Sequence, residues 1–236
     1  MEETDSSRWI DCNDRPVDRA PNLPPLRIRL AGHAVTRLVA GFPWSWALLR
    51  PGVEAFFDSA ATSWDSRTAV GSYEYLEPLA VALGKVEVRP ERLLDIGCGT
   101  GEATLFLARE FPTAGIRGVD LSEEMIRRAT RKIGLDPSAR VSFRVGDGSD
   151  LPWPEDSFDL VVQVNVPLFP REVARVLRRG GEFVSVSTLG ADTPFDTPER
   201  WYRRALSRAG MLPAASGRVG TGTWRIARLS GDERSS

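Results

Sequence analysis

The chain has few of the residues that build cross-linked or metal-binding proteins. Its 236 residues include two cysteines, Cys12 and Cys98, and a single histidine, His33. One cysteine lies in a polar tail and the other among glycines, a poor pair for a disulfide, so we expect reduced thiols and a cytoplasmic location. Because there is no cluster of His and Cys, and no set of aspartates at a ligand spacing, we expect no metal site.

Long apolar runs and an excess of charge are also missing. The longest uncharged stretch of the apolar N-terminal region, residues 38–49, contains Gly41 and Pro43 and is too short to span a bilayer. The acidic start of the chain does not resemble a secretory signal. The 31 Lys and Arg residues nearly cancel the 32 Asp and Glu residues, so we expect no nucleic-acid partner.

Hydrophobic residues make up 42% of the chain and charged residues 27%, as in a soluble globular protein with one sizeable domain. Residues 1–25 are polar and rich in proline, which indicates a mobile tail. Residues 26–90 contain three stretches with helical periodicity, at 26–49, 53–64 and 73–83, and we interpret them as a helical cap.

From residue 91 the sequence alternates between apolar strands and amphipathic helices. We expect strands at 92–96, 116–121, 141–145, 158–164 and 182–187, helices at 101–110, 122–133, 170–179 and 198–209, and a final hairpin from 216–219 and 223–229. Ser122 is the expected N-cap of its helix. The pattern predicts a doubly wound, mostly parallel α/β sheet with a C-terminal antiparallel hairpin over residues 91–229, and a short tail at 230–236.

Residues 93–101, Leu-Leu-Asp-Ile-Gly-Cys-Gly-Thr-Gly, run from a strand through three glycines into a helix. Glycines let the backbone turn sharply and approach a ligand closely. Asp120 ends the second strand, where a carboxylate can accept hydrogen bonds from ribose hydroxyls. Asp147 ends the third strand, where a carboxylate can accept a hydrogen bond from the amino group of adenine. The three strand ends meet at the carboxyl edge of the sheet, where open α/β folds bind ligands.

A nicotinamide-binding fold is the main alternative, because it also combines glycines with a later acidic residue. Its loop has the spacing G-x-G-x-x-G, whereas the glycines here are Gly97, Gly99 and Gly101 and the next residue is Glu102. A carboxylate at a helix N-terminus disfavours a pyrophosphate there. Asp95, just before the glycines, suits an ammonium or sulfonium ligand instead.

These segments resemble the class I (Rossmann-like) S-adenosylmethionine-dependent methyltransferase family. The resemblance covers about residues 91–188 and includes the motifs at 95–101, 118–122, 147–152, 158–162 and 175–181, in the family's order. Residues 56–65 are similar to the N-terminal helix that covers the cofactor in the quinone-biosynthesis and small-molecule branches. The resemblance implies that the cofactor, S-adenosyl-L-methionine, is bound by Asp95, Gly97, Gly99, Gly101, Asp120, Leu121, Asp147, Gly148 and Gln163.

The implied activity is in-line methyl transfer to a small, apolar acceptor, with a nicotinamide-dependent oxidoreductase or a non-catalytic nucleotide-binding protein as alternatives. The sulfonium activates its own leaving group, so positioning dominates and no strong base is required; the catalytic residues stay open. The short segment between strand 158–164 and Pro170 leaves little acceptor-contacting surface.

Arginines flank apolar and Trp residues over 26–50, and no acid occurs between Leu23 and Val53. This pattern predicts either a cap or weak contact with a membrane surface. The acceptor atom and the oligomeric state stay open.

Overall fold

The computed structural model describes residues 23–68, 73–133 and 140–231, and within them it places a seven-stranded sheet of order β3-β2-β1-β4-β5-β7-β6. The first five strands are parallel, and β7 and β6 add to β5 as an antiparallel pair. This arrangement confirms the predicted doubly wound sheet with its C-terminal hairpin. The strands are β1 (Arg92–Ile96), β2 (Gly115–Asp120), β3 (Val141–Val145), β4 (Phe158–Val164), β5 (Leu177–Ser187), β6 (Met211–Val219) and β7 (Gly222–Leu229).

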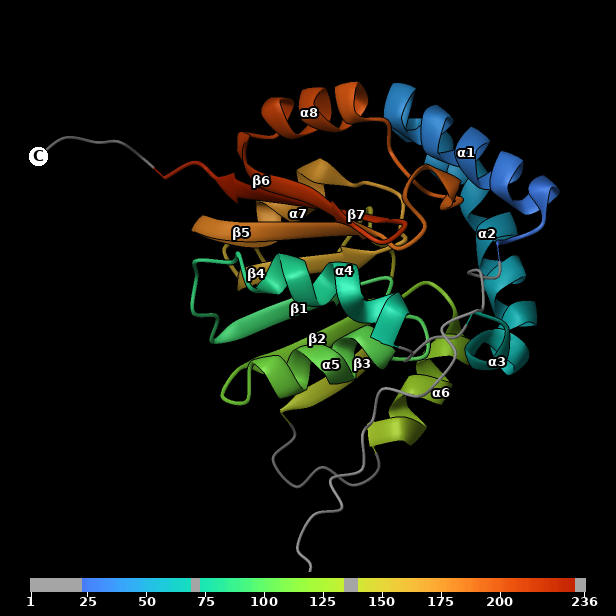
Figure 1. Cartoon of the computed structure of the whole chain (residues 1–236), viewed down its shortest axis with the longest axis horizontal. Helices are drawn as coiled ribbons and strands as arrows, with labels where there is room; N and C mark the ends of the chain where they lie inside the picture. Colours follow the sequence, from blue (N-terminus) through green and yellow to red (C-terminus); the bar gives the residue numbers. More distant parts are fainter. Residues whose placement is uncertain (1–22, 69–72, 134–139, 232–236) are drawn as a thin grey trace, which may run out of the picture.

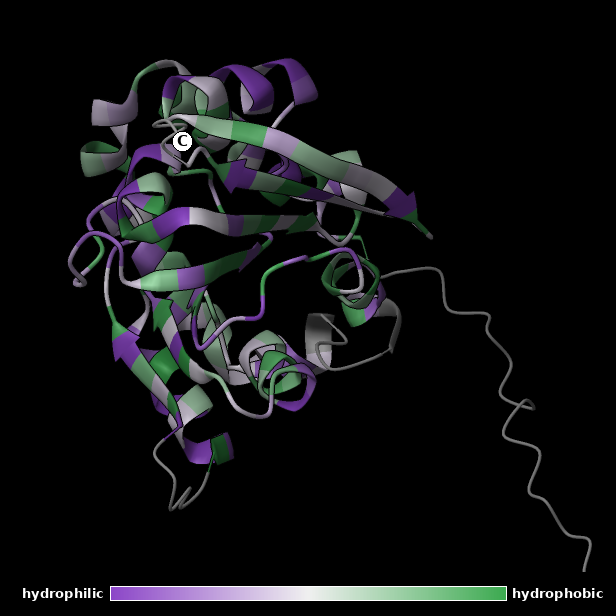
Figure 2. Cartoon of the chain, turned by 90° about the vertical axis from the view of Figure 1, so that its left-hand side faces the viewer, coloured by the Kyte–Doolittle hydropathy of each residue, from purple (hydrophilic) through white to green (hydrophobic). Residues whose placement is uncertain are grey.

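Helices cover both faces of the sheet, which explains the nearly continuous apolar sequence of the central strand β4. On one face, α4 (Tyr73–Leu83) and α5 (Glu102–Glu110) bury Leu79 and Leu107 against β1, β4 and β5 (Figure 1). On the other face, α7 (Pro170–Val176) and α8 (Glu199–Arg208) bury Val173 and Leu206. Hydrophobic segments recur along the strands between these layers (Figure 2). The remaining core helix, α6 (Glu123–Ile133), packs beside β3 and β2.

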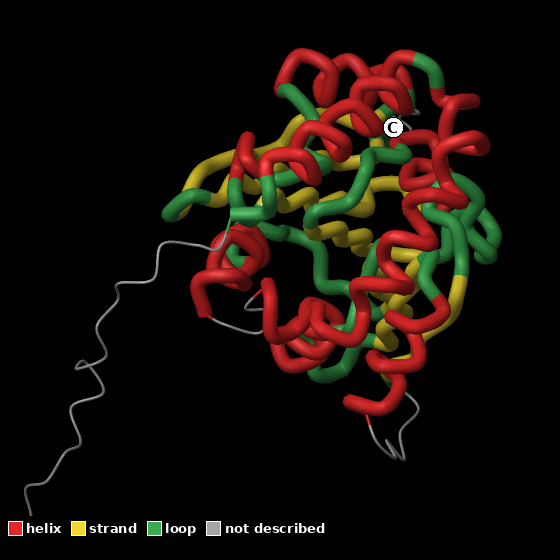
Figure 3. The backbone as a smooth tube through the Cα atoms, turned by 90° about the vertical axis from the view of Figure 1, so that its right-hand side faces the viewer, coloured by secondary structure: helices red, strands yellow, loops and turns green. Residues whose placement is uncertain are grey.

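The N-terminal helices lie at the carboxyl end of the parallel strands. They are α1 (Leu26–Gly41), α2 (Trp46–Ala60) and α3 (Trp64–Thr68), linked by the short turns η1 (Pro43–Ser45) and η2 (Ala61–Ser63), and we call them the N-terminal cover. Figures 1 and 3 show the cover running along this end of the sheet. Among the described residues, no helix combines the length and the apolar character needed to cross a membrane.

The expected cap of residues 26–90 therefore divides into two parts. α4 carries three buried apolar residues, Leu79, Ala82 and Leu83, and packs with β5, β6 and β7, so it belongs to the layer on the sheet face. Only the helices before it form a cover. A boundary at residue 90 would separate α4 from the core that it helps to build, so the cap prediction is corrected at this point.

Two expected element bounds are also corrected. The expected helix 170–179 ends at Val176, and β5 begins at Leu177, so Gly180 and Gly181 lie within a long strand. Leu177 is fully buried and pairs with Phe158, with an irregular register before Leu160. The expected helix over 26–49 is broken at Phe42 and Pro43 into α1 and α2.

Candidate functional site

The glycine-rich loop between β1 and α5 adopts a backbone that favours glycine. Gly97, Gly99 and Gly101 have φ values of +68°, +53° and +89°. A Cβ atom on Gly97 would lie 2.3 Å from the Val166 side chain, and one on Gly101 would lie 2.8 Å from Phe143. A Cβ on Gly99 would meet no heavy atom within 4 Å. Packing therefore requires the first and third glycines, whereas the middle glycine faces open space that a ligand could use.

The side chain of Asp95 is buried beside this loop, and the residue is 1% exposed. Its Oδ2 accepts a hydrogen bond of 2.6 Å from the Thr104 hydroxyl, while no described group donates to its Oδ1. Burial raises the pKa of Asp95 to about 7, although the bond from Thr104 acts in the opposite direction. A buried carboxyl with one oxygen unpartnered fits a cationic ligand group, because such a group would satisfy the oxygen and favour the charged form.

Asp120 joins the end of β2 to the glycine-rich loop. Its Oδ2 accepts from the backbone N–H of Gly99 and its Oδ1 from that of Ser122, both at 2.9 Å. Burial raises the pKa of Asp120, and these two backbone bonds oppose the rise. A carboxylate offers about four lone-pair sites, so an Asp120 carboxylate held rigidly in this way keeps capacity for ribose hydroxyls. Ser122, two residues after Asp120, caps α6 as predicted, because its Oγ accepts a hydrogen bond from the N–H of Met125 at 3.1 Å.

The carboxylate of Asp147, after β3, already accepts hydrogen bonds from three other residues. The indole nitrogen of Trp46 donates to Oδ1 at 2.8 Å and to Oδ2 at 3.0 Å. The N–H of Ser149 also donates to Oδ1, and the Arg50 guanidinium donates to Oδ2 at 3.3 Å. Sequence reasoning missed this partnership, because nothing in the pattern of residues 46–50 indicates contact with a loop about one hundred positions later.

Gly148 and Gln163, two further predicted site residues, lie near the ends of β3 and β4. A Cβ on Gly148 would lie 3.0 Å from the Phe169 ring and 3.1 Å from Ile96, so close packing limits side chains there. Gln163, at the end of β4, is 3% exposed and donates to the Val166 carbonyl at 3.3 Å, and its Oε1 has no described donor. It lies beside β1, whose Ile96 is its register partner. An orphaned buried oxygen is a further point at which a ligand could bind.

The N-terminal cover contacts the strand-end loops through two of its own carboxylates. Ser122 donates through its hydroxyl to Asp58 of α2, and Thr100 donates to Asp65 of α3. Lys132 of α6 pairs with both Asp65 and Glu102, at 2.7 Å each. Lys132 therefore offsets part of the negative charge of Glu102, and the charge argument against a phosphate ligand rests more on the buried Asp95. The segment 56–65 thus lies over the loops that the resemblance implied.

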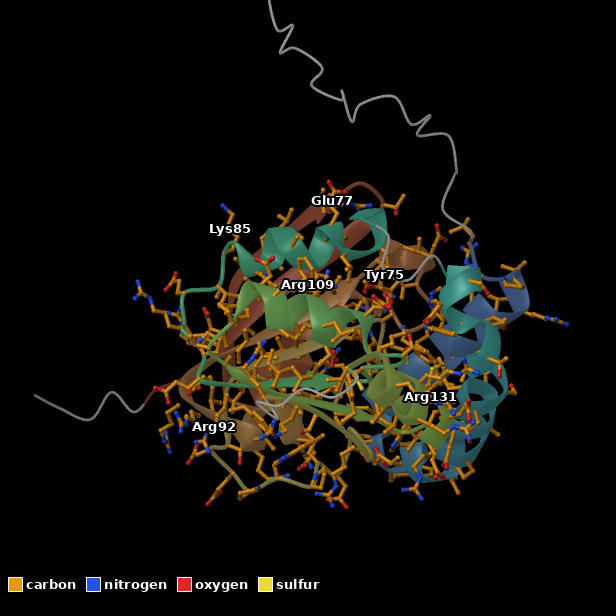
Figure 4. The ribbon with its side chains drawn as sticks, turned by 90° about the horizontal axis from the view of Figure 1, so that it is seen from below. Tyr75, Glu77, Lys85, Arg92, Arg109 and Arg131 are labelled. Atoms are coloured by element: carbon orange, nitrogen blue, oxygen red, sulfur yellow. The ribbon has the colours of Figure 1, made fainter. Side chains whose placement is uncertain are left out.

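Asn165 is a second residue that sequence reasoning missed. It follows β4 with a left-handed backbone, φ 57°, a conformation that Asn tolerates better than most residues. Its amide accepts from the N–H of Thr188 and donates to the Thr188 hydroxyl, both at 2.9 Å, and donates to Tyr75 at 3.4 Å. Burial raises the pKa of Tyr75 to about 12. Figure 4 places Tyr75 at the end of α4 that faces the cover, with Lys85 just beyond the other end.

The one histidine has a structural contact. Nε2 of His33 lies 3.0 Å from the carbonyl oxygen of Thr193 and ties α1 to the loop after β5. Within residues 23–68, 73–133 and 140–231, no three His, Cys, Asp or Glu side chains are placed to hold a metal ion together. The loop from Asn165 to Phe169, between β4 and α7, is short, as the sequence indicated.

Comparison with known proteins agrees with the fold and the loop motifs. Residues 93–181 match the family model described as a methyltransferase domain. The chain is 38% identical over 132 residues to the fatty-acid O-methyltransferase of Mycolicibacterium smegmatis, covering 53% of this chain and 45% of that protein. It is 30% identical over 163 residues to the demethylmenaquinone methyltransferase of Lactiplantibacillus plantarum, covering 64% of this chain and 68% of that protein.

Solved structures share the architecture. A SAM-dependent methyltransferase from Aquifex aeolicus superposes with a TM-score of 0.57, at 19% identity, over 66% of this chain and 92% of that one. At this identity the similarity shows the fold. The chain spans about half the length of two of these curated relatives, 45% of the fatty-acid enzyme and 52% of the malonyl-[acyl-carrier protein] O-methyltransferase of Halorhodospira halophila.

Proposed function

Since this chain belongs to the class I S-adenosylmethionine-dependent methyltransferase family, we propose that it transfers a methyl group from S-adenosylmethionine to a small apolar acceptor. One observation carries the proposal. A Cβ on Gly99 would meet open space, and the loop of Gly99 directly follows Asp95, a buried carboxyl with a free oxygen, and is held by the strand-end carboxyl of Asp120.

The chain's own residues provide binding and orientation in this proposal. Gly99 allows close backbone approach, Asp95 favours a cationic group, and Asp120 accepts from the ribose. The loop at Asp147 and Gly148, with Leu121 and Gln163, surrounds the adenine. The cofactor supplies an activated methyl group on a sulfonium, so the protein's part is alignment and exclusion of water, and no residue is assigned as a base.

Two observations, one on the relatives and one on the cover, support the proposal of an apolar acceptor. Two similar proteins are named for fatty-acid and demethylmenaquinone substrates, which are apolar. The helices α1 and α2 and the turn η1 between them expose large apolar side chains, among them Leu30 (59%), Trp44 (68%) and Leu48 (75%). Arginines interrupt this surface without any acid between Leu23 and Val53. We therefore include weak contact with an anionic membrane surface in the proposal. A cytoplasmic setting suits the free, buried thiol of Cys98.

Calorimetry with the full chain tests the cofactor. S-adenosylmethionine and S-adenosylhomocysteine should bind with measurable heat, whereas NADH should not. A mass-spectrometric screen of fatty acids, quinols and other apolar acceptors should then show a gain of one methyl group that depends on the cofactor. Binding of NADH alone would favour the oxidoreductase, and cofactor binding without transfer to any acceptor would favour the non-catalytic alternative.

Sedimentation with vesicles tests the membrane contact. The unaltered chain should sediment with vesicles that contain anionic lipids and be released by salt, and Leu48→Glu should abolish this. Leu212→Glu is the matched control, because Leu212 is similarly exposed, at 60%, but belongs to β6. If the unaltered chain stays in the supernatant, or if both substitutions act equally, the membrane contact is refuted while the methyl-transfer proposal stands.

A further inference from the structure

We infer that Trp46 occupies the adenine position of the cofactor site, so that the cofactor binds only after the first turn of α2 has moved away from Asp147. The inference rests on the proposed function, because that function assigns Asp147 to the adenine amino group. It adds a contact by which the protein fills its own adenine position, and Trp46, which makes this contact, lies outside every motif of the family resemblance.

The hydrogen bonds of Asp147 provide the first argument. Its two oxygens offer about four lone-pair sites. Trp46 uses one on each oxygen, Ser149 uses a second on Oδ1, and Arg50 a second on Oδ2. The Asp147 side chain is 12% exposed, so water cannot easily replace these donors. An adenine amino group could therefore bond to Asp147 only if a present donor left.

The packing of the indole provides the second argument. Trp46 is 6% exposed and forms a buried cluster with Val39 and Phe169, against which Leu121 also packs. The Trp46 and Phe169 rings meet edge to face, with centroids 5.1 Å apart. Phe169 in turn limits the space beside Gly148. A planar bicyclic ring with an N–H donor at its edge thus lies among the residues assigned to adenine, itself a planar bicyclic ring with an amino donor.

The sequence of α2 lets the first turn move separately from the rest of the helix. Pro51 lies inside α2 and has no N–H, so the bond from position 51 to the Ala47 carbonyl is missing. Gly52 follows, and a Cβ there would contact nothing within 4 Å. Beyond this weak point, Asp58 holds the end of the helix to Ser122. Residues 46–50 can therefore swing outward while the remainder of the cover stays attached.

Substitution of Trp46 gives opposite results under the two possible roles of the residue. If the indole competes with adenine, Trp46→Phe removes the donor and should tighten S-adenosylhomocysteine binding by about tenfold, the value of one hydrogen bond to a charged group. Trp46→Ala, which also empties the ring position, should tighten binding further. Trp44→Ala, two residues away and 68% exposed, is the matched control and should not change the affinity.

The calorimetric measurement is paired with fluorescence. In the unaltered chain, cofactor binding should shift tryptophan emission to longer wavelength and raise acrylamide quenching, as Trp46 leaves its buried cluster. This change should be absent in Trp46→Phe and retained in Trp44→Phe. Circular dichroism and melting curves verify that each variant is folded, and the conservative Trp46→Phe serves if Trp46→Ala does not fold.

Weaker or unchanged affinity in folded Trp46→Phe would overturn the inference, because the indole would then be a wall of the adenine pocket or a bystander. Such a result leaves the proposed function intact, since the unaltered chain still binds. Absence of binding in the unaltered chain and in both Trp46 variants would overturn the proposed function and the inference together.

Discussion

The hydroxyl of Thr104, in the first turn of α5, donates to Oδ2 of Asp95 at 2.6 Å, and this bond holds a buried carboxyl beside the glycine-rich loop. The other oxygen of Asp95 has no donor among the described residues. The loop and the helix that follows it are thereby fixed relative to β1, and one acceptor of negative character is left for a ligand. The bond also sets the direction of a measurable pH dependence.

Cofactor binding should strengthen as pH rises. The folded chain raises the pKa of Asp95 to about 7, so below that pH the carboxyl is largely neutral, and a cationic ligand must displace its proton. Affinity for S-adenosylmethionine should rise about tenfold between pH 6 and pH 8, with proton release detectable by calorimetry in buffers of different ionisation enthalpy. Asp95→Asn should bind weakly with a flat pH profile; an unchanged slope would assign the effect to another group.

The carboxyl of Asp95 affects the free energy of unfolding in the opposite direction, so stability should decrease as pH rises. Since the pKa of Asp95 in the folded chain lies above its ordinary value of 3.8, the native state between these two pH values binds a proton that the unfolded state has lost. The contribution of Asp95 to the free energy of unfolding should therefore decrease from about pH 4 to about pH 7 and then become constant. Chemical denaturation of the unaltered chain and Asp95→Asn at several pH values measures the difference; a difference that grows in favour of the unaltered chain would contradict this.

Gly99 and Gly180 form a matched pair for testing the open space at the loop. Both have positive φ, +53° and +75°, and neither would place a Cβ within 4 Å of another atom. Alanine at either position should lower the free energy of unfolding by about 1–2 kcal/mol. Only Gly99→Ala should also reduce cofactor affinity, because its Cβ enters the proposed ligand space. Equal affinities in the two variants would make the loop purely structural.

Replacement of Asp120 should affect both binding and the fold. Asp120→Ala leaves the N–H groups of Gly99 and Ser122 without acceptors and removes the proposed ribose contact, so affinity should fall by about 1.5–3 kcal/mol. Asp159→Ala is the control, because Asp159 also accepts two backbone N–H groups, those of Glu91 and Arg92, away from the site. Both variants should melt earlier. Loss of affinity in both, or in neither, would refute the ribose assignment.

The pair between Glu182 and Arg228 should dominate the stability of the β5–β7 junction. Glu182 is 1% exposed and accepts from the N–H groups of Glu87 and Val88 as well as from Arg228. Arg228→Ala leaves a buried carboxylate without its charge partner and should cost about 3–5 kcal/mol in denaturation experiments. Arg178→Ala, which breaks a more exposed pair with Asp159, should cost under about 1 kcal/mol. Comparable losses would show that burial does not govern these pairs.

The sequence alone determined the elements whose signals are local. The bounds of β1, β4 and α4 follow directly from apolar runs and periodicity, and Ser122 caps its helix as its type and position predicted. The three glycines predicted a sharp turn, and Gly97, Gly99 and Gly101 have the positive φ values of such a turn. That the acidic strand ends mark the edge of the sheet that carries the site stays a prediction. The inferences about helices, strands and turns succeed because backbone preference and the alternation of strands and helices depend on neighbouring residues.

Only the tertiary structure decided the contacts between distant segments. Leu177 joins β5 because it pairs with Phe158 and buries its side chain, although the glycines at 180 and 181 favour a turn. Trp46 donates a hydrogen bond to Asp147, and α4 packs on the sheet face rather than with the cover. No short sequence pattern encodes either contact. A hydrogen bond between residues far apart in the chain depends on where the whole sheet places them, and that placement is a property of the assembled core.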